Sequence, residues 1–411
     1  MTPGRVALLG GSLEGGGAQQ FALRLADALI RDGHKVWVVS LDANCDFDLG
    51  KYPALKDRVV WLSGADVSRG TVGKVVDAPL QCLRLYRFLR SHRIDVVLSL
   101  QERSNILNLL LPGAVRRILS VRSYPDAMLK RKSPLKRWLI MAIYGLLLGR
   151  ADRVILNSRA AAENFTALFR MSPARVDVIY NLCDVDVLQR RALEPVPESL
   201  RRAYPGPLVL TGGRMIPDKG HCHLLRAFRM VLAKQPDAAL VIAGKGPLEH
   251  RLRELARQLS IERHVFFPGF VENMSALISA ATVFVLPSRR EGFPNALLEA
   301  VALGCPSIAS DCLSGPRELV APASPFRQLT AGVEKAACGW LVPPPDGADC
   351  PSANATLSGA ERALAEAMIE LLRDAPSREV LHRAALDRGR AFSPERIIPQ
   401  WLEVLAAPAR G

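Results

Sequence analysis

The sequence predicts an α/β protein made of two parallel-sheet domains, and two observations support this class. The chain has 411 residues, which exceeds the size at which one hydrophobic core normally stops growing. Short apolar runs alternate with helical patterns in each half, and the alternation restarts after a segment at 192–207 that holds four prolines. Hydrophobic residues make up 49% of the chain and charged residues 23%, as in folded globular proteins.

The first half follows a strand–loop–helix–strand order. An apolar run at Val6–Leu9 leads through a glycine-rich turn into a helical pattern at Ala18–Arg31. A unit of this kind implies a parallel sheet with a right-handed crossover. Further strands are expected at Lys35–Leu41, Val96–Leu100, Ile118–Val121 and Val154–Asn157.

The second half repeats this order. Strands are expected at Leu208–Gly212, Ala239–Ala243, Val265–Phe267, Val283–Pro287, Ser307–Ser310 and Gly339–Val342, and helices at Gly220–Lys234, Leu248–Leu259 and from Asn295. Most of the remaining part of 321–358 is expected to be surface loop. The predicted domains are 1–190 and 208–395, with a linker at 191–207 and a C-terminal helix at 396–411 that can pack back on the first domain. Because ligands of such sheets bind beyond the carboxyl ends of the strands, the loops there are expected to face one cleft.

A glycine-rich loop from Gly10 to Gly17 separates the first strand from its helix. Glycines let the backbone approach a ligand closely, and the following helix N-terminus favours an anion. The spacing is neither GxGxxG nor a GK[ST] phosphate loop, so a plain strand–helix turn explains it equally well.

Charged side chains stand in two loops of the second half. Arg214 and Lys219 can neutralise a diphosphate together, and two solvated loop cations are the alternative. Glu291 and Glu299 lie on either side of Asn295, which is expected to cap a helix. Carboxylates accept hydrogen bonds from vicinal hydroxyls, so the two suit a sugar ring and a ribose, with solvated surface as the alternative.

Five segments of the second half occur in the order and spacing of a known family: GGRMIPDKG, VIAGKGPLEHRL, VFFPGF, VLPSRREGFPNALLEAVALGCPSIASD and SGPREL. Among them, EGFPNALLE matches an E-x7-E motif. With these segments, and with GGSLEGGGAQQFALRLADALIRDGHKV in the first half, the chain resembles family 4 of the retaining glycosyltransferases. The resemblance is to members that build bacterial surface polysaccharide or lipid-linked oligosaccharide.

This resemblance implies a GT-B fold, in which two Rossmann-like domains face each other across a cleft. The first domain would bind the acceptor and the second the donor. Arg214 and Lys219 would then hold the donor diphosphate, Glu291 the transferred sugar and Glu299 the ribose. Further donor contacts are expected at Gly16, Gly17, Gly213, Gly244, Gly246, Phe270, Asn295 and Ala296. Neither a metal nor a cofactor is expected, since the nucleotide-sugar is a co-substrate.

The expected activity is transfer of a sugar from a UDP-hexose or UDP-N-acetylhexosamine to a glycan or polyprenyl-diphosphate-linked acceptor. Two mechanisms can retain the anomeric configuration. One is a same-face reaction in which the leaving diphosphate deprotonates the acceptor, and the other proceeds through a covalent intermediate. A non-catalytic sugar-nucleotide-binding partner and an epimerase on the same fold are the alternatives. Many members of the family carry a first-domain histidine, but the equivalent stretch Ser120–Pro125 has none. Arg122 and Tyr124 are therefore the candidates on the acceptor side.

The net charge of +14 predicts an anionic partner. Zinc-finger spacing and RNP-type aromatic strings are missing, which disfavours nucleic acid and favours an anionic membrane surface. Basic residues crowd the stretch before Trp138, and this arrangement suits insertion at headgroup level. They are Arg116, Arg117, Arg122, Lys130, Arg131, Lys132, Lys136 and Arg137. The alternative is a buried core helix at Leu139–Leu148 with solvated cations beside it.

Cysteine usage and the apolar segments predict the compartment. The eight cysteines are scattered without a CxxC pair, which predicts reduced, buried thiols rather than a disulfide framework or a metal site. The N-terminus reaches glycine too soon for a secretory signal. The longest apolar run, Trp138–Gly149, is shorter than the ~20 residues that a membrane span needs. We therefore expect a cytoplasmic protein held peripherally at the inner face of the cell membrane.

Overall fold

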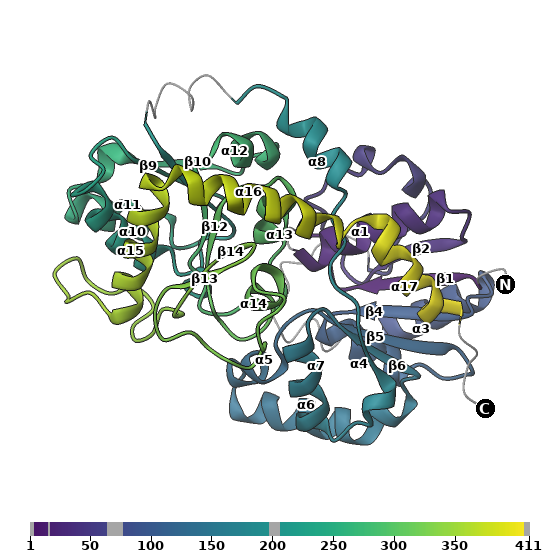
Figure 1. The fold of residues 1–411 in the computed structure, drawn as a ribbon. Helices are drawn as coiled ribbons and strands as arrows, with labels where there is room; N and C mark the ends of the chain where they lie inside the picture. Colours follow the sequence, from purple (N-terminus) through teal and green to yellow (C-terminus); the bar gives the residue numbers. More distant parts are fainter. Residues whose placement is uncertain (1–3, 15–16, 64–76, 197–205, 407–411) are drawn as a thin grey trace. The chain divides into compact units, whose positions relative to one another are not determined.

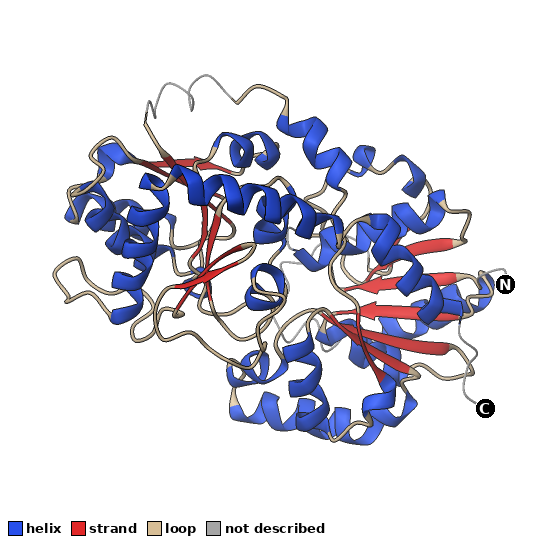
Figure 2. Ribbon diagram, in the orientation of Figure 1, coloured by secondary structure: helices blue, strands red, loops and turns tan. Residues whose placement is uncertain are grey.

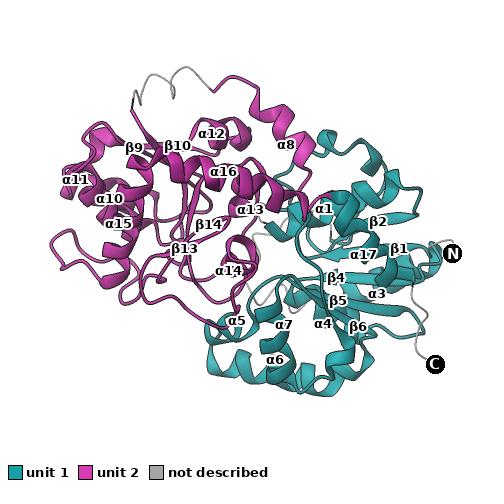
Figure 3. Ribbon diagram, in the orientation of Figure 1, with its two compact units in different colours: residues 1–182, 394–411 teal, residues 183–393 magenta. Residues whose placement is uncertain are grey.

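The structure is a computed structural model that describes residues 4–14, 17–63, 77–196 and 206–406. The chain forms two compact units, which consist of residues 1–182 with 394–411 (unit 1) and residues 183–393 (unit 2) (Figure 3). Each unit is built on one seven-stranded sheet with helices packed against it (Figure 2). The predicted α/β class with two parallel-sheet domains is confirmed.

In unit 1 all seven strands are parallel and follow the order β3-β2-β1-β4-β5-β6-β7. The first six positions reproduce the Rossmann strand order. The strands are β1 (Val6–Gly10), β2 (Val36–Ser40), β3 (Val59–Trp61), β4 (Val96–Leu100), β5 (Arg116–Val121), β6 (Arg153–Leu156) and β7 (Val176–Val178). Sequence patterns missed β3 and β7 because each has three residues and neither is fully buried. Central strands such as β4 and β5 are buried throughout, which is why they stand out as apolar runs.

The C-terminal helix returns to unit 1 after the chain has completed unit 2 (Figure 1). Its Trp401 is fully buried, with its ring centroid 5.6 Å from that of Phe21. Arg116 of β5 donates a hydrogen bond of 2.8 Å to the carbonyl of Leu405. The helices of the unit are α1 (Gly17–Arg31), α3 (Ala78–Ser91), α4 (Glu102–Leu110), α5 (Pro125–Lys130), α6 (Pro134–Leu147), α7 (Arg159–Phe169) and α17 (Pro394–Ala406).

Unit 2 repeats the same strand order as β10-β9-β8-β11-β12-β14, with β13 added at the edge. The strands are β8 (Leu208–Gly212), β9 (Ala239–Ala243), β10 (Val265–Gly269), β11 (Val283–Leu286), β12 (Ser307–Ser310), β13 (Glu334–Ala336) and β14 (Gly339–Val342). All pairings are parallel except that of β13 with β14. The prediction that 321–358 holds one strand was wrong, because Glu334–Ala336 pairs with β14 as a short polar edge strand.

The helices of unit 2 are α8 (Val185–Ala192), α10 (His221–Leu232), α11 (Glu249–Gln258), α12 (Met274–Ala280), α13 (Asn295–Ala302), α14 (Pro316–Val320), α15 (Gly359–Arg373) and α16 (Ala375–Arg390). The unit begins at Cys183, ahead of the predicted linker at 191–207, because α8 is tied to the start of α12. Asn273 donates a hydrogen bond of 2.8 Å to the carbonyl of Arg191. Residues 197–205 of that linker lie outside the described residues. Within the described ranges, every helix is too short or too polar to cross a bilayer.

Candidate active site

The loops that leave the carboxyl ends of the unit 2 strands meet backbone to backbone. Met215, after β8, donates to the carbonyl of Lys245, after β9, over 3.0 Å. Arg289, after β11, donates to the carbonyl of Asp218 over 2.8 Å. These bonds hold the loops that contain the predicted donor residues in one fixed group. This is the sheet edge at which open α/β sheets bind their ligands.

Gly220 lets two of these loops touch. It has φ +67°, and a Cβ atom there would lie 1.9 Å from the carbonyl oxygen of Pro287. Any other residue would push the β8 loop away from the β11 loop. The glycine therefore brings Lys219 beside the segment that carries Glu291.

Lys219 and Glu291 form an ion pair at this edge. The Lys219 ammonium lies 2.6 Å from Oε1 of Glu291, and the hydroxyl of Ser288 donates to the same oxygen over 2.6 Å. Ser288 is fully buried, and the side chains of Lys219 and Glu291 are 25% and 9% exposed. Lys219, predicted together with Arg214 to hold a diphosphate, thus has Glu291 as its charged partner in the structure.

The β12 loop fixes the backbone of the Glu291 segment from the other side. The hydroxyl of Ser314 lies 2.9 Å from the carbonyl oxygen of Glu291 and 2.8 Å from that of Gly292. Nearby, burial raises the pKa of the Cys312 thiol well above its usual value, and the charge of Glu291 raises it further. Cys312 therefore adds no charge to this edge at neutral pH.

The remaining donor candidates of unit 2 lie on the same loops. Arg214 is exposed and makes no ion pair within the described ranges, and Phe270 presents 73% of its surface beyond β10. Gly213, Gly244 and Gly246 lie in the β8 and β9 loops. This edge thus holds an exposed cation and an exposed aromatic ring in addition to the Lys219–Glu291 pair.

The second half of the E-x7-E segment lies in α13, and the start of this helix differs from the prediction. Asn295 is not the cap; it is the first helical residue, and Pro294 precedes it in an extended conformation. Pro294 itself takes the cap position, because the φ that its ring fixes also suits an extended residue and it has no backbone N–H that needs a partner there. Asn295 and Ala296 therefore place backbone N–H groups of the first turn at the loop, and Glu299 follows one turn later, half-buried.

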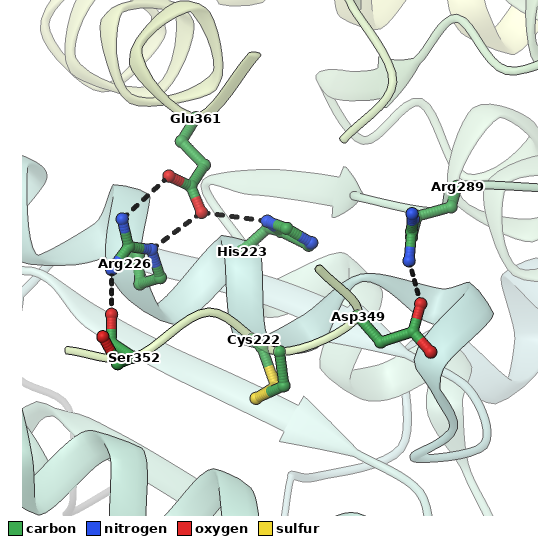
Figure 4. Close-up of a disulfide and its surroundings, with 8 residues drawn as sticks. Cys222, His223, Arg226, Arg289, Asp349, Ser352 and Glu361 are labelled. Atoms are coloured by element: carbon green, nitrogen blue, oxygen red, sulfur yellow. Dashed lines mark hydrogen bonds and ion pairs between the residues drawn. A yellow bond between two sulfur atoms is a disulfide. The ribbon is translucent and has the colours of Figure 1, made fainter. Parts of the chain in front are cut away.

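A disulfide behind this edge contradicts the prediction that all cysteines are reduced. Cys222, in the first turn of α10, is bonded to Cys350 in the loop 343–358 (Figure 4). Sequence spacing did not show the pair because 128 residues separate its members. Arg289 ties the same loop to the Glu291 segment through Asp349 and the carbonyls of Pro345 and Gly347.

A buried ion cluster holds the other end of the loop 343–358. Arg226 donates to the carboxylate of Glu361 over 2.8 Å and to the carbonyls of Ser352, Ala355 and Thr356. His223 contributes a third contact to Glu361 at 2.9 Å (Figure 4). Burial alone raises the pKa of Glu361, but the hydrogen bonds from His223 and Arg226 outweigh it and lower the pKa to about 2.

The corresponding edge of unit 1 holds its charged groups differently. Arg122, directly after β5, lies over the ring of Phe21 at 3.6 Å and donates to the side-chain oxygen of Asn181. Burial lowers the pKa of Arg122 to about 9. Its Nη1 atom is buried and makes no hydrogen bond with the described residues. Tyr124 is half-buried and precedes α5.

The glycine loop of unit 1 is described only in part. Gly17 begins α1, and Gly16 lies outside the described residues. A cavity of about 680 Å³ also lies in unit 1, but its lining includes Gly4, Val96 and Arg116 at the amino ends of the strands. It is therefore on the side of the sheet opposite to the edge with the predicted residues.

Comparisons with known proteins decide the family. The chain matches the model "Glycosyltransferase Family 4" over residues 15–187 and the model "Glycosyl transferases group 1" over residues 194–350. The chain belongs to glycosyltransferase family 4. An uncharacterised glycosyltransferase of Methanocaldococcus jannaschii is 27% identical over 77% of this chain and 80% of its own length.

Two further comparisons place this glycosyltransferase among characterised proteins. The N-acetylgalactosamine-N,N'-diacetylbacillosaminyl-diphospho-undecaprenol 4-alpha-N-acetylgalactosaminyltransferase of Campylobacter jejuni is 27% identical, with 64% of this chain and 70% of that protein covered. The crystal structure of HepE from Anabaena in complex with UDP and glucose superposes with a TM-score of 0.75 at 20% identity, covering 98% of this chain and 99% of HepE. The expected GT-B architecture is confirmed.

Several site features of this glycosyltransferase were not predicted from its sequence. Ser288 and Ser314 lie within the segments VLPSRREGFPNALLEAVALGCPSIASD and SGPREL, but their contacts to the Glu291 segment were not predicted. In unit 1, Arg103 is held by both oxygens of Asp42 at 2.9 and 2.8 Å and by Gln81 at 2.8 Å. The Arg103–Asp42 contact joins residues 61 positions apart in the chain, and local patterns carry no trace of it.

The basic stretch of the glycosyltransferase differs in part from its prediction. Arg116 and Arg117 are buried in β5 and Arg122 is stacked on Phe21, so these three do not belong to a basic surface. The first turns of α6 do present both charged and apolar groups. Lys136 and Arg137 are exposed there beside Leu135 and Trp138, while Ile140 and Tyr144 face the core.

Within the described ranges, no three His, Cys, Asp or Glu side chains gather as metal ligands would. Asp184, the first residue of the Asp184-Val185-Asp186 run, instead caps α8 and accepts a hydrogen bond of 3.0 Å from the backbone of Val187. Asp184 therefore has a structural role.

Proposed function

We propose that this glycosyltransferase moves a hexose or N-acetylhexosamine from a UDP-sugar to a glycan or polyprenyl-diphosphate-linked acceptor, with retention and without a metal or cofactor. The observation that carries the proposal is the Lys219–Glu291–Ser288 cluster at the carboxyl edge of the unit 2 sheet. Two relatives support the substrate classes: HepE was solved with UDP and glucose, and the Campylobacter jejuni protein is named for transfer to a diphospho-undecaprenol acceptor.

In this proposal the donor diphosphate lies against Arg214, Lys219 and the N-terminus of α13. Two cations and a helix N-terminus neutralise two phosphates without a divalent ion. Glu291 accepts a hydrogen bond from the transferred sugar, and Glu299 accepts from the ribose. Phe270 offers its exposed ring to the base.

The reaction breaks the bond between the anomeric carbon and the β-phosphate oxygen and forms a bond to the acceptor oxygen. In the same-face version the acceptor proton passes to the leaving phosphate oxygen, so no protein base is consumed. Negative charge develops on the diphosphate as the bond breaks, where Arg214 and Lys219 stabilise it. A covalent intermediate is the competing route, with Glu291 as the nearest carboxylate to Lys219.

The test is product formation from UDP- and GDP-sugars with and without acceptor, with the anomeric configuration of the product determined by NMR. The proposal expects an α-linked product from an α-linked donor and full activity in EDTA. An inverted product, activity that requires added manganese or magnesium, or conversion of the donor without an acceptor would contradict it.

We further propose that the first turns of α6 dock on an anionic membrane surface, where a lipid-linked acceptor enters. Leu135 and Trp138 are 74% and 67% exposed next to Lys136 and Arg137. Apolar side chains beside cations suit the headgroup region, and each cation contributes about 1 kcal/mol there. The fraction of protein that floats with phosphatidylglycerol liposomes should fall at high salt, and it should fall in the Trp138→Ala variant. Binding that changes with neither salt nor this substitution, or no binding at all, would exclude this docking surface.

A further inference from the structure

Two hydrogen-bond donors converge on one oxygen of Glu291. The Lys219 ammonium and the Ser288 hydroxyl each lie 2.6 Å from Oε1, and within the described ranges no group donates to Oε2. The ammonium is charged and partly exposed, whereas the hydroxyl is neutral and buried. Lys219 can therefore be drawn away by another anion, but Ser288 has no such competitor.

A donor diphosphate is such an anion. Lys219 cannot neutralise a diphosphate fully while it neutralises Glu291, and a carboxylate held on the same ammonium repels the phosphates. We propose that the Lys219–Glu291 ion pair is a latch that opens when the donor diphosphate takes Lys219 and leaves Ser288 holding Glu291 for the transferred sugar. This inference rests on the proposed function, because it assigns the diphosphate to Lys219.

The surrounding backbone keeps Glu291 in place when Lys219 moves. Ser314 contacts the carbonyl oxygens of Glu291 and Gly292, and Arg289 donates to the carbonyl of Asp218 over 2.8 Å. A long, flexible lysine side chain can change partner at little cost, whereas this segment is fixed at several points. The exchange therefore moves the cation and leaves the carboxylate ready for the sugar.

The latch predicts that a substitution of Glu291 strengthens UDP binding, whereas substitution of an ordinary binding residue weakens it. Glu291→Gln removes the charge that competes for Lys219 but keeps an oxygen for the Ser288 hydroxyl. The Kd of UDP, measured by isothermal titration calorimetry with GDP in parallel, should fall roughly two- to fivefold in this variant, from the strength of a partly exposed ion pair. Turnover of the UDP-sugar should fall at the same time, because the contact to the sugar is weakened.

Asp218→Asn is the matched control, since it removes the negative charge of Asp218, which pairs with Arg290 and precedes Lys219 in the chain, and leaves the Lys219–Glu291 ion pair in place. An equal gain in UDP affinity in both variants would reduce the effect to general electrostatics and overturn the latch, as would unchanged or weaker UDP binding by Glu291→Gln. If the wild-type enzyme binds neither UDP nor GDP, the proposed function itself fails, which is a different result.

Ser288 is the positioning residue of this arrangement, and its role has its own readout. Ser288→Ala should leave the Kd of UDP within about twofold while kcat of sugar transfer falls, because only the orientation of Glu291 is lost. A crystal structure of the wild-type enzyme with UDP needs no variant. It should show the Lys219 ammonium on phosphate and Ser288 still on Glu291; an intact Lys219–Glu291 bond beside bound UDP would overturn the inference.

Discussion

The carboxyl edges of the two sheets differ although the first six strands of each sheet follow the same order. In unit 2, Lys219 is one quarter exposed and Arg214 is exposed without an ion pair in the described ranges. In unit 1, Arg103 is held by both oxygens of Asp42, and Arg122 lies on Phe21. Strand order thus determines which loops lie at the carboxyl edge of the sheet. The ion pairs, hydrogen bonds and ring contacts of each charged side chain determine whether it remains available to a ligand.

The supports behind the edges differ as well. In unit 2 the loop 343–358 is fastened by the Cys222–Cys350 disulfide and by the fully buried cluster of Arg226 and Glu361. The cysteines of unit 1, among the residues described, are free thiols. We therefore expect perturbations behind the unit 2 edge to cost more stability than equivalent changes in unit 1.

The largest expected effect is that of Glu361→Gln. It leaves Arg226 charged and buried without its counter-ion, which typically costs about 3–5 kcal/mol in the free energy of unfolding. The matched change in unit 1 is Asp42→Asn, whose partner Arg103 is 29% exposed and can be solvated; a cost of about 1.5 kcal/mol is expected. Urea titrations measure both, and equal losses would break the comparison.

The same cluster sets a pH dependence. Because the pKa of Glu361 is lowered from 4.5 to about 2 in the folded protein, the stability that its carboxylate contributes is complete above pH 4.5 and declines as the pH falls toward 2. Urea titrations between pH 7 and pH 3 should show a smaller acid-dependent loss in Glu361→Gln than in the wild type. An identical acid dependence would contradict the assignment.

Next in size is reduction of the disulfide. Opening a bond that closes a long loop typically costs about 2–4 kcal/mol in the free energy of unfolding. Dithiothreitol should therefore lower the stability of the wild-type protein, but not that of a Cys222→Ala/Cys350→Ala double variant. Equal sensitivity of the two proteins to reductant would show that the disulfide does not strengthen unit 2.

The third effect is on activity. Lys219→Ala removes a charge-assisted contact to phosphate of about 1.5–3 kcal/mol, so kcat/KM should fall roughly 10- to 150-fold with the fold intact. Lys234→Ala, an exposed lysine beyond the other end of α10, is the control and should keep wild-type activity. Equal activity of both variants would remove Lys219 from the donor site.

Local sequence patterns mark the unit 2 loops that directly follow strands, but they miss contacts between distant residues in both units, for a physical reason. Ligand-binding loops such as 213–220 must follow a strand directly and use glycine where backbones touch, as Gly220 does against Pro287. Both requirements are visible locally in the sequence, as an apolar run followed directly by a loop that contains glycine. The Arg122–Asn181 and Cys222–Cys350 contacts join residues 59 and 128 positions apart, and no local pattern records them.

Secondary structure shows the same division. Buried strands such as β4 and β8 were predicted with their observed bounds, because continuous apolar runs mark strands covered on both faces. The three-residue strands β3, β7 and β13 were missed, since none is fully buried and none alternates long enough to be recognised.

The central claim is that the donor nucleotide is held by the unit 2 edge through Lys219. Thermal unfolding with and without UDP tests it most directly in the wild type, Lys219→Ala and Arg122→Ala. At a UDP concentration about one hundredfold above the wild-type Kd, the wild type and Arg122→Ala should each gain about 2.7 kcal/mol, and Lys219→Ala about half of that or less. Equal protection of all three proteins, or protection lost in Arg122→Ala and kept in Lys219→Ala, would contradict the account.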